Sequence, residues 1–447
     1  MSKTQTGENY EIKSLDLALT GHLTIEWAEK HMPVLSSVKK RFEKEQPLAG
    51  IVIGACLHVT KETAVLALAL RAGGAELHLC ASNPLSTTDE VASALVEHGI
   101  SVYAWKGMDH EGYYRSIAQV IKVKPQITVD DGADLVSTLH KLKRGESGPE
   151  MQIVHEMLGS ERDQIENVLA GAEETTTGVI RLRAMAEDGA LLYPILATND
   201  TPTKRWFDNE FGTGQSTFDG ILRATADLIA GSVFVVAGFG YCGRGIAYRA
   251  RGLGARRVIV AEIDQLKALR AAHEGFEVMP MAEAASIGDF FITATGCKSV
   301  IRPEHAKVMK NGVVLGNAGH FDIEIDIPGI KALAKEVKVF RPGTETVILP
   351  DGRNITILAE GRLCNLANAE GHPSQVMDLS FSDQALAIEW IVKNQDFLKS
   401  TGGKVLEIPE EIDRMVASLK CEAMGLKFDI LSSDQEAYLS GWEEGTS

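Results

Sequence analysis

Polar side chains follow the predicted strands of the first half of the chain, at the points where these strands end. They are His58 after residues 50–56 (GIVIGAC), Asn83 and Ser86 after residues 75–80 (AELHLC), and Asp130 and Asp131 within residues 127–132 (ITVDDG). In an open parallel sheet, ligands bind beyond the carboxyl ends of the strands. Imidazole and carboxylate groups gathered there could exchange protons with a ligand. Taken singly, each of them could equally be a helix cap or a turn former.

A glycine-rich turn in the second half has the pattern of a dinucleotide site. Residues 238–243 (GFGYCG) follow a predicted strand and open a helix, and Glu262 ends the next strand. Such glycines let the backbone approach a pyrophosphate, and the helix N-terminus supplies free N–H donors. A carboxylate at Glu262 would accept a hydrogen bond from a ribose 2′-OH and repel a 2′-phosphate, which favours NAD over NADP. Lys267 weakens that preference, and a tight turn without a ligand is the alternative.

Three further stretches are more polar than the sequence around them. They are residues 173–178 (EETTTG), 204–209 (KRWFDN) and 319–326 (GHFDIEID). The threonine hydroxyls of the first stretch could contact a phosphate or a nicotinamide amide. Lys204 and Asp208 are four residues apart and could share a helical face, although a surface ion pair would have the same spacing. His320 directly follows a predicted buried strand, at the edge where a nicotinamide would lie.

Strands alternate with helical segments in both halves, which indicates βαβ units and mainly parallel sheets. Besides the strands above, the pattern predicts helices over 60–71 and 89–98 and strands over 101–105, 233–238, 257–262, 276–279, 290–296 and 313–319. We therefore expect an α/β protein of two doubly wound domains with a boundary near 205–220. Residues 141–160 are polar and poorly periodic, which predicts a surface excursion. From Ile408 onward we expect a helix and then a polar tail.

Length and composition limit the classes of protein that this chain can belong to. A chain of 447 residues with 45% hydrophobic and 24% charged residues is typical of a globular protein of two or three domains. A run of about 18 apolar residues and a secretory signal are both missing, and the six cysteines are scattered, so we expect a cytoplasmic protein with reduced thiols. The net charge of −16 argues against a nucleic-acid partner, and neither zinc nor calcium ligand spacing occurs.

Several of these segments, taken in order, resemble the motifs of the S-adenosylhomocysteine hydrolases. The matching segments are DDGADL, EETTTG, WFDNEFGTGQS, VAGFGYCGRG, GNAGHFDIEID and AEGRLCNLANAEGHPS. The resemblance extends from about Leu17 to Trp442 and is much more specific than the glycine pattern alone. GTGQS and YCGRG are similar to the archaeal and thermophile-type branch of the family.

The resemblance implies a substrate-binding domain over 1–207, completed by a return segment over 374–405. It implies a Rossmann NAD-binding domain over 208–373 and a C-terminal dimerisation arm over 406–447. Members of the family are generally homotetramers that hold NAD tightly between closed domains. The tail YLSGWEEGTS departs from the Lys- and Tyr-bearing tail with which many members cover the NAD of a partner subunit. Thr213 stands where many members have a cysteine near the nicotinamide.

The resemblance also implies a reaction that is redox-neutral overall. Bound NAD⁺ oxidises the ribose 3′-OH to a ketone, the C4′ hydrogen becomes acidic, homocysteine leaves from C5′, water adds, and the hydride returns. The implied catalytic residues are His58, Asp131, Lys204, Asp208 and His320. The implied substrate-binding residues are Thr60, Glu62, Asp131, Glu174, Lys204, Asp208 and His372. Those implied for NAD are Thr175, Thr176, Thr177, Asn209, Gly238, Gly240, Tyr241, Cys242, Gly243, Glu262, Thr295 and Asn365. We expect no metal.

Three other functions remain open at this point. A plain NAD-dependent dehydrogenase would consume NAD⁺, and a non-catalytic NAD-binding regulator would turn over no substrate. The same chemistry on S-inosylhomocysteine is the third alternative. Glu62 bears on it, because an ionised carboxylate accepts a hydrogen bond from the amino group of adenine and opposes the carbonyl of hypoxanthine. Lys61 is adjacent, but neighbouring helical residues are about 100° apart, so only one of the two can face the base.

Overall fold

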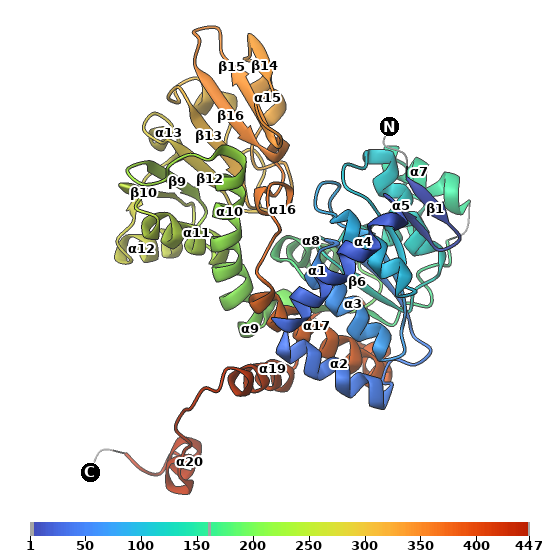
Figure 1. Ribbon diagram of the computed structural model, residues 1–447. Helices are drawn as coiled ribbons and strands as arrows, with labels where there is room; N and C mark the ends of the chain where they lie inside the picture. The colour runs from blue at the N-terminus through green and yellow to red at the C-terminus, as the bar shows by residue number, and fades with distance from the viewer. Residues whose placement is uncertain (1–3, 160–161, 446–447) are drawn as a thin grey trace.

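The computed structural model describes residues 4–159 and 162–445 and has two mainly parallel sheets, each covered by helices (Figure 1). This confirms the predicted α/β class with two doubly wound sheets. The two halves stand side by side, and the chain passes between them twice (Figure 1). Among the described residues, no helix is both long enough and apolar enough to cross a membrane.

The first sheet has the order β1-β2-β5-β4-β3-β6-β7-β8-β17 and is parallel except for the hairpin of β1 and β2. Its strands are β1 Gln5–Gly7, β2 Tyr10–Ile12, β3 Val52–Leu57, β4 Glu76–Ala81, β5 Ser101–Ala104, β6 Ile127–Asp130, β7 Ala170–Glu173, β8 Ile195–Ala197 and β17 Val405–Glu407. The order runs outward in both directions from the neighbours β3 and β6. Ligands of doubly wound sheets bind at such a switch point, beyond the carboxyl ends of the two strands.

The second sheet has the order β11-β10-β9-β12-β13-β16-β15-β14. Its strands are β9 Val233–Ala237, β10 Arg257–Ala261, β11 Glu277–Val278, β12 Phe290–Thr293, β13 Val313–Asn317, β14 Glu336–Lys338, β15 Thr344–Ile348 and β16 Asn354–Leu358. β9 and β12 are neighbours at the centre, and β15 runs antiparallel to β14 and β16. The glycine-rich turn after β9 and the turn after β12 therefore meet at one edge.

Helices fill the connections and bury both faces of the sheets. Those around the first sheet are η1 Leu15–Leu17, α1 Ala18–Lys30, α2 Pro33–Glu45, α3 Lys61–Ala72, α4 Asp89–Glu97, α5 His110–Lys122, α6 Asp134–Arg144, α7 Pro149–Leu158, α8 Thr176–Glu187, η2 Thr198–Asp200 and α9 Pro202–Lys204. Those around the second are α10 Thr213–Thr225, α11 Tyr241–Gly252, α12 Gln265–His273, α13 Met281–Ala284, α14 Pro303–Ala306, α15 Ile327–Lys331, η4 Ala359–Gly361 and α16 Cys364–Ala367.

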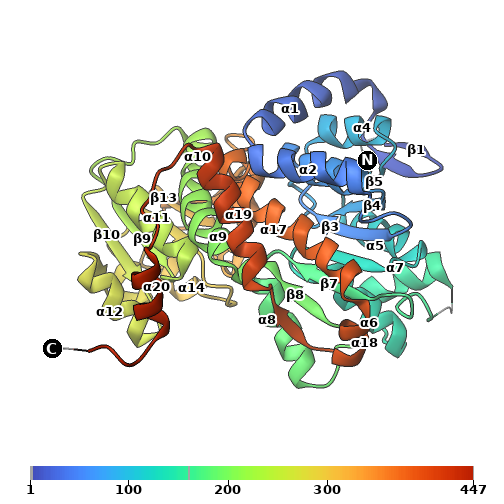
Figure 2. The same ribbon diagram turned by 90° about the horizontal axis from the view of Figure 1, so that it is seen from below.

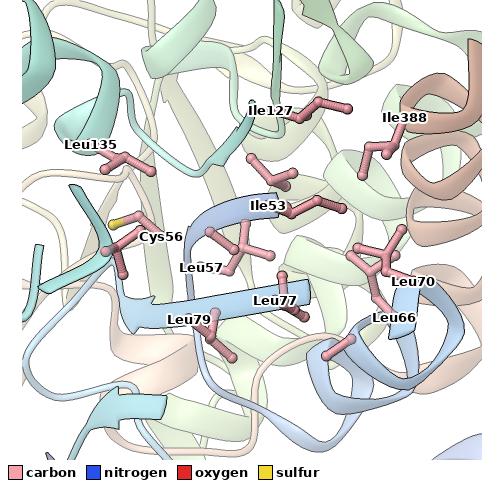
Figure 3. Close-up of a cluster of buried hydrophobic side chains, with 14 of the residues drawn as sticks. Ile53, Cys56, Leu57, Leu66, Leu70, Leu77, Leu79, Ile127, Leu135 and Ile388 are labelled. Carbon is pink, nitrogen blue, oxygen red and sulfur yellow. The ribbon is translucent and has the colours of Figure 1, made fainter. Parts of the chain in front are cut away.

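Two segments carry the chain between the sheets. The first is the π-helix η3 (Arg205–Gly212), which leads into α10, and the second is residues 362–373, which lead from η4 into α17 (Ser374–Lys393). α17 returns to the first sheet and packs against α2 and α3. Its Ile388 joins the buried cluster of Ile53, Leu66 and Ile127, so the returning helix is part of the first core (Figure 3).

The segment 141–160, predicted as a surface excursion, is largely helical, and that prediction is wrong for most of its length. α6 continues to Arg144 and α7 spans Pro149–Leu158, while Ser160 lies outside the described residues. Met151 and Val154 of α7 are fully buried and pack in the first core. Three residues apart on a helix, they form a narrow apolar stripe that the polar composition concealed.

The C-terminal segment has more structure than a helix and a polar tail. β17 pairs with β8, so residues 406 and 407 belong to the first sheet, and α18 (Gln395–Thr401) precedes it. α19 (Glu410–Ala423) packs on α17 and α2, and a further helix, α20 (Ser433–Ser440), follows. After α19 the described chain extends away from both halves and carries α20 near its end (Figure 1). We call residues 424–445 the arm.

Candidate active site

A cavity of about 1370 Å³ lies between the two sheets. The ends of β3, β6 and β7 and the start of α8 line it from one side, and the turns after β9, β10, β12 and β13 line it from the other. Of the residues that the sequence predicted for catalysis, substrate or cofactor, all but Gly243 line this cavity. The structure therefore brings together residues up to 314 positions apart, from His58 to His372.

The loops that follow β3 and β6, the two strands at the switch point, meet a loop of the second sheet. His58 Nε2 lies 3.5 Å from Asp131 Oδ2, and His320 Nδ1 lies 3.4 Å from Asp131 Oδ1. His320 can come this close because residue 132 is a glycine: a Cβ there would lie 2.1 Å from His320 Nε2. The ligand atoms of the three residues lie within 4.8 Å of one another, so they could also hold a metal ion, which sequence spacing did not reveal.

His58 faces Ser86 with one ring nitrogen and Asp131 with the other. Ser86 Oγ donates to Asn83 O at 3.1 Å and lies 2.7 Å from His58 Nδ1, so it accepts from an Nδ1–H. Burial, aided by the charge of His372, lowers the pKa of His58 to about 3, so its ring is neutral and Nε2 is an acceptor. Burial also raises the pKa of Asp131. Ser86 therefore fixes the tautomer of His58 in which Nε2 faces Asp131 with its lone pair.

Lys204 lies buried among two carboxylates and an amide. Its Nζ is 2.9 Å from Asp208 Oδ2, 3.3 Å from Glu174 Oε1, and donates to Asn209 Oδ1 at 2.9 Å. The 204–208 pair is therefore a buried pair at the cavity, and the alternative of a surface ion pair is excluded. Burial alone would lower the pKa of Lys204, but Asp208 and Glu174 raise it overall, so the side chain is an ammonium.

Glu174 is the carboxylate with the fewest partners in this group. Only 4% of it is exposed, and neither oxygen has a hydrogen-bond donor of good geometry in the described chain. Burial raises its pKa to about 8, although Lys204 opposes the shift. A buried carboxylate without donors can accept hydrogen bonds from a ligand's hydroxyls.

Asp208 lies in the first crossing between the sheets and contacts His372 of the second crossing. Its Oδ1 is 2.7 Å from His372 Nδ1, and its Oδ2 accepts from Ser380 Oγ of α17 at 2.6 Å. Burial alone would raise the pKa of Asp208, but Lys204 and His372 lower it overall. His372 Nε2 is 3.3 Å from Thr213 Oγ1, so the two crossings are tied together at the cavity.

Glu62 lies in the first turn of α3, and Thr60 caps that helix by accepting from Thr63 N. Glu62 is 1% exposed and its Oε1 accepts from Ser374 Oγ at 2.6 Å. The neighbouring Lys61 reaches both Glu62, at 3.3 Å, and Glu370, at 3.0 Å. Glu62 therefore lines the cavity, and Lys61 lies between Glu62 and the exposed carboxylate of Glu370.

The glycine-rich turn fits a dinucleotide. Gly238 has φ +93°, Gly243 has no room for a side chain because its Cβ would lie 2.0 Å from Gly238 O, and Gly240 faces open space in the cavity. Glu262 accepts from the N–H groups of Phe239, Ile263 and Asp264, which fixes its carboxylate at the end of β10. The turn is thus shaped as the sequence predicted, with a free approach at Gly240.

Other predicted cofactor residues surround the middle of the cavity. Thr176 and Asn209 both donate to Asn199 Oδ1 at 3.1 Å, and Thr177 Oγ1 lies 3.7 Å from the position of a Cβ on Gly296, across the two sheets. Asn365 is 2% exposed, and its Oδ1 has no hydrogen-bond partner in the described chain. Such a buried acceptor fits an amide of a bound cofactor.

Sequence reasoning missed several residues that hold the site in place. Glu173 accepts from Gly132 N, Thr175 N and Thr175 Oγ1, so it ties the loop that carries Asp131 to the start of α8. Glu324 accepts from Thr295 and Gly296 beside the glycine-rich turn. Both occur in stretches noted for their polarity, but spacing cannot separate a carboxylate that faces a ligand from one that faces backbone N–H groups.

The chain matches the family model described as S-adenosyl-L-homocysteine hydrolase over residues 9–446. An adenosylhomocysteinase of Aquifex aeolicus is 55% identical over 98% of this chain and 100% of its own length. One of Saccharolobus solfataricus is 52% identical, and an S-inosyl-L-homocysteine hydrolase of Methanocaldococcus jannaschii is 49% identical, both over 98% of this chain and all of their own.

Some solved structures show a distant likeness to this chain. The A chain of dipicolinate synthase from Bacillus subtilis has a TM-score of 0.43 at 11% identity, over 78% of this chain and 98% of that one. The match to the family model and to relatives of half-identical sequence spans nearly every residue of the cavity and both sheets. On that evidence, the chain belongs to the S-adenosyl-L-homocysteine hydrolase family.

Proposed function

We propose that this enzyme catalyses the reversible hydrolysis of S-adenosyl-L-homocysteine to adenosine and L-homocysteine through transient oxidation of the ribose 3′-OH by bound NAD⁺. The observation that carries the proposal is the position of the Lys204–Asp208–Glu174 cluster in the same cavity as the glycine-rich turn. Relatives of half-identical sequence named adenosylhomocysteinase support it.

Bound NAD⁺ would supply reversible hydride transfer with the 3′-carbon of the ribose. The residues proposed to hold its phosphates are those of the glycine-rich turn, Gly238, Gly240, Tyr241, Cys242 and Gly243, and Glu262 would bind its ribose. Around the nicotinamide the proposed contacts are Thr175, Thr176, Thr177, Asn209, Thr295 and Asn365. The free approach at Gly240 and the unpartnered Asn365 Oδ1 support this assignment.

Lys204 would bind the substrate's 3′ oxygen as an ammonium. In that state it donates a hydrogen bond and stabilises the negative charge that develops as the hydroxyl loses its proton. To accept that proton itself, Lys204 must first give one to a neighbour. Glu174 is 3.3 Å away and its pKa is raised to about 8, so in its ionised form it is the more basic of the two neighbouring carboxylates and would take up that proton. Asp208 would hold the ammonium in place from the other side.

Asp131 and His58 would move the second proton. Asp131 would take a proton from C4′ and, 3.5 Å from His58 Nε2, pass it to the imidazole, which would deliver it toward the sulfur of the leaving thiol. His320, which reaches Asp131 from the second sheet, would close the cavity over the sugar and exclude water. Thr60, Glu62 and His372 would surround the base.

The deciding experiment compares two products. Purified protein supplied with S-adenosylhomocysteine should release homocysteine thiol, measured with a thiol reagent, without NADH accumulating at 340 nm. Lys204→Met should give no NADH signal at all, and Asp131→Asn should oxidise the ribose but release no thiol. NADH formed in step with product would establish a dehydrogenase instead, and bound NAD without any thiol release would establish a regulator.

The relative that is named for S-inosyl-L-homocysteine makes the inosine substrate the second candidate. Glu62 favours adenine, because a hydrogen bond to a charged group contributes about 1.5–3 kcal/mol, or roughly a 10- to 150-fold preference. Comparing kcat/KM for adenosine and inosine in the wild type and in Glu62→Lys tests this. Lys61→Met is the matched control, because Lys61 meets Glu62 and Glu370 but would not face the base.

We also propose a homotetramer in which the arm docks on a second copy, and a division into domains at 1–207 with 374–405, 208–373 and 406–447. Exposed apolar side chains along the arm support the docking: they are Met424, Leu426, Phe428, Ile430, Leu431, Tyr438, Leu439 and Trp442. The six free cysteines support a reducing, cytoplasmic location.

A further inference from the structure

Two aspartates that the proposed reaction does not use bracket α9, the short helix that carries Lys204. Asp383 comes from α17 and is fully buried, and Asp413 comes from α19. α9, α17 and α19 contact one another and lie together between the two halves (Figure 2). Both aspartates reach the same side chain, Thr203, the residue before Lys204.

Thr203 has one hydroxyl hydrogen and two carboxylates to meet. Its Oγ1 is 2.6 Å from Asp383 Oδ2 and 2.5 Å from Asp413 Oδ1. One hydrogen can serve only one of these contacts, and two bare carboxylate oxygens would not both lie so close to one hydroxyl oxygen. The second contact therefore needs a proton on a carboxyl group, which donates to Oγ1 while Oγ1 donates to the other aspartate.

The surroundings assign this proton to Asp383. Burial and the nearby Asp413 raise the pKa of Asp383 to about 7, and the Thr201 and Thr203 hydroxyls and Lys204 oppose the shift. Asp413 is partly exposed and already accepts from Thr203 N at 3.0 Å. Other charged groups packed on α17 have charged partners of their own. Among them are Arg41 with Glu389, Lys420 with Asp378, His372 with Asp208, and Glu62 with Lys61.

The same contacts fix the backbone at Lys204. Thr201 Oγ1, which donates to Asp383 Oδ2 at 2.9 Å, accepts from Lys204 N and so caps α9. Thr203 N and Oγ1 are held by Asp413. Thr203 and the N-cap Thr201, one and three positions before Lys204, are therefore anchored. Thr201 is held by α17, and Thr203 is held by both α17 and α19.

We propose that Asp383, Thr203 and Asp413 form a proton-sharing bridge that positions Lys204, and that through it α19 becomes part of the active-site framework. The inference rests on the proposed function for the role of Lys204, but the bridge itself is a property of the folded chain. Asp383, Thr203 and Asp413 are positioning residues, since none of them lines the cavity.

The first test removes the hydroxyl that joins the two aspartates. Thr203→Val should lower the rate of adenosine-dependent NADH formation in a single turnover by about 10- to 100-fold, because small displacements of a reacting group are costly. KM for adenosine and the NAD content should change less than about threefold. Thr203→Ser restores the hydroxyl and should restore the rate. Thr138→Val, at a buried threonine of α6, is the matched control and should leave the rate unchanged.

The second test follows the proton without substrate. Because the pKa of Asp383 is raised in the folded state, its stabilising effect is present at low pH and is lost as the pH rises through about 7. The Tm of the wild type should therefore fall relative to that of Asp383→Asn between pH 5 and pH 8.

The outcomes separate the bridge from the proposed function. A wild type that forms no NADH with adenosine contradicts the function, while the Tm measurements still decide the bridge. A wild-type rate in Thr203→Val, or Thr203→Ser as slow as Thr203→Val, overturns the positioning role. A Tm difference between wild type and Asp383→Asn that is the same at every pH overturns the shared proton.

Discussion

Gly132 lies directly beneath the imidazole of His320, where the two halves of the molecule meet. A Cβ at this position would lie 2.1 Å from Nε2, and the residue has φ +97°. Gly132→Ala should push His320 away from Asp131 and lower kcat at least about tenfold, while NAD binding at the glycine-rich turn persists. Steady-state kinetics with adenosine and homocysteine, together with the NAD content, measure both effects.

Gly352→Ala provides the control for backbone strain alone. Gly352 has φ +88°, and a Cβ there would meet nothing within 4 Å. Gly352→Ala should lose about as much stability as Gly132→Ala and keep the kcat of the wild type. Equal kcat values for the two variants would show that the approach of His320 to Gly132 is unimportant for turnover.

The pKa of Glu174 predicts how stability changes with pH. Burial raises that pKa from 4.5 to about 8, so the folded protein binds a proton that the unfolded chain releases. The contribution of Glu174 to stability is therefore greatest below pH 4.5 and is lost as the pH rises to about 8. Glu174→Gln does not have this loss, so its Tm should rise relative to the Tm of the wild type as the pH increases from 5 to 8.

Glu187→Gln, on the exposed end of the same helix α8, is the comparison. Its Tm should follow that of the wild type at every pH. Parallel Tm curves for the wild type and Glu174→Gln would contradict the protonation of Glu174.

The residues that face the cavity were largely predictable, because motif residues beyond strand ends converge whenever the strands are parallel. His58, Asp131 and Glu174 are examples. Position beyond a strand end does not tell which member of each acidic pair faces the cavity, and only the family resemblance singled out Asp131 and Glu174. In the pairs 130–131 and 173–174 the first residue binds backbone N–H groups and the second lines the cavity.

At the scale of elements, the predicted strands of both sheets agree with the structure to within a few residues at their ends. β3, for example, spans Val52–Leu57 where 50–56 was predicted. Buried parallel strands are continuous apolar runs and are easily recognised. β1 and β14, at the sheet edges, and β2, next to β1, are short and polar and gave no such signal. Strand order and the pairing of β17 with β8 depend on distant contacts that no local pattern encodes.

α7 is the clearest case of a helix hidden by its composition, and its packing can be tested. Met151 is fully buried, so Met151→Ala should lower the free energy of unfolding by about 2–5 kcal/mol through loss of contacts and a cavity. Denaturant unfolding would measure this. kcat should not change, because α7 lies away from the cavity lining.

Gln152→Ala is the control on the exposed side of the same helix. It should change stability by less than about 0.5 kcal/mol. A loss as large as that of Met151→Ala would mean that helix propensity, rather than burial, holds α7 in place.

At the scale of the whole molecule, the arm is a separate structural part. Its apolar side chains are exposed and include Phe428, Ile430 and Trp442, which are 72%, 87% and 89% exposed. Removal of residues 424–447 should therefore reduce the oligomeric state measured by light scattering and leave the Tm of the two sheets nearly unchanged. Three changes within the full chain, Phe428→Ser, Ile430→Ser and Trp442→Ser, should have the same effect.

None of the described residues of the arm lines the cavity between the sheets, so within one chain the arm leaves the proposed NAD site uncovered, and NAD should exchange readily. Exchange of labelled NAD into the holoenzyme measures this. Faster exchange after removal of the arm would show that the arm covers the cofactor of another copy. An unchanged oligomeric state after truncation would place the subunit contacts elsewhere.

The two crossings between the sheets give the molecule the geometry of a lever. Asp208 and His372 lie on the crossings, and Lys204 directly precedes the first one. A rotation of one half against the other about the two crossings would move these groups little, whereas His320, out on the second half, would travel with it. Groups at such an axis would hold a nucleoside while the halves are apart, and the distant imidazole would arrive afterwards. Affinity and enclosure would then be separable steps, because the fold gives them different distances from the pivot.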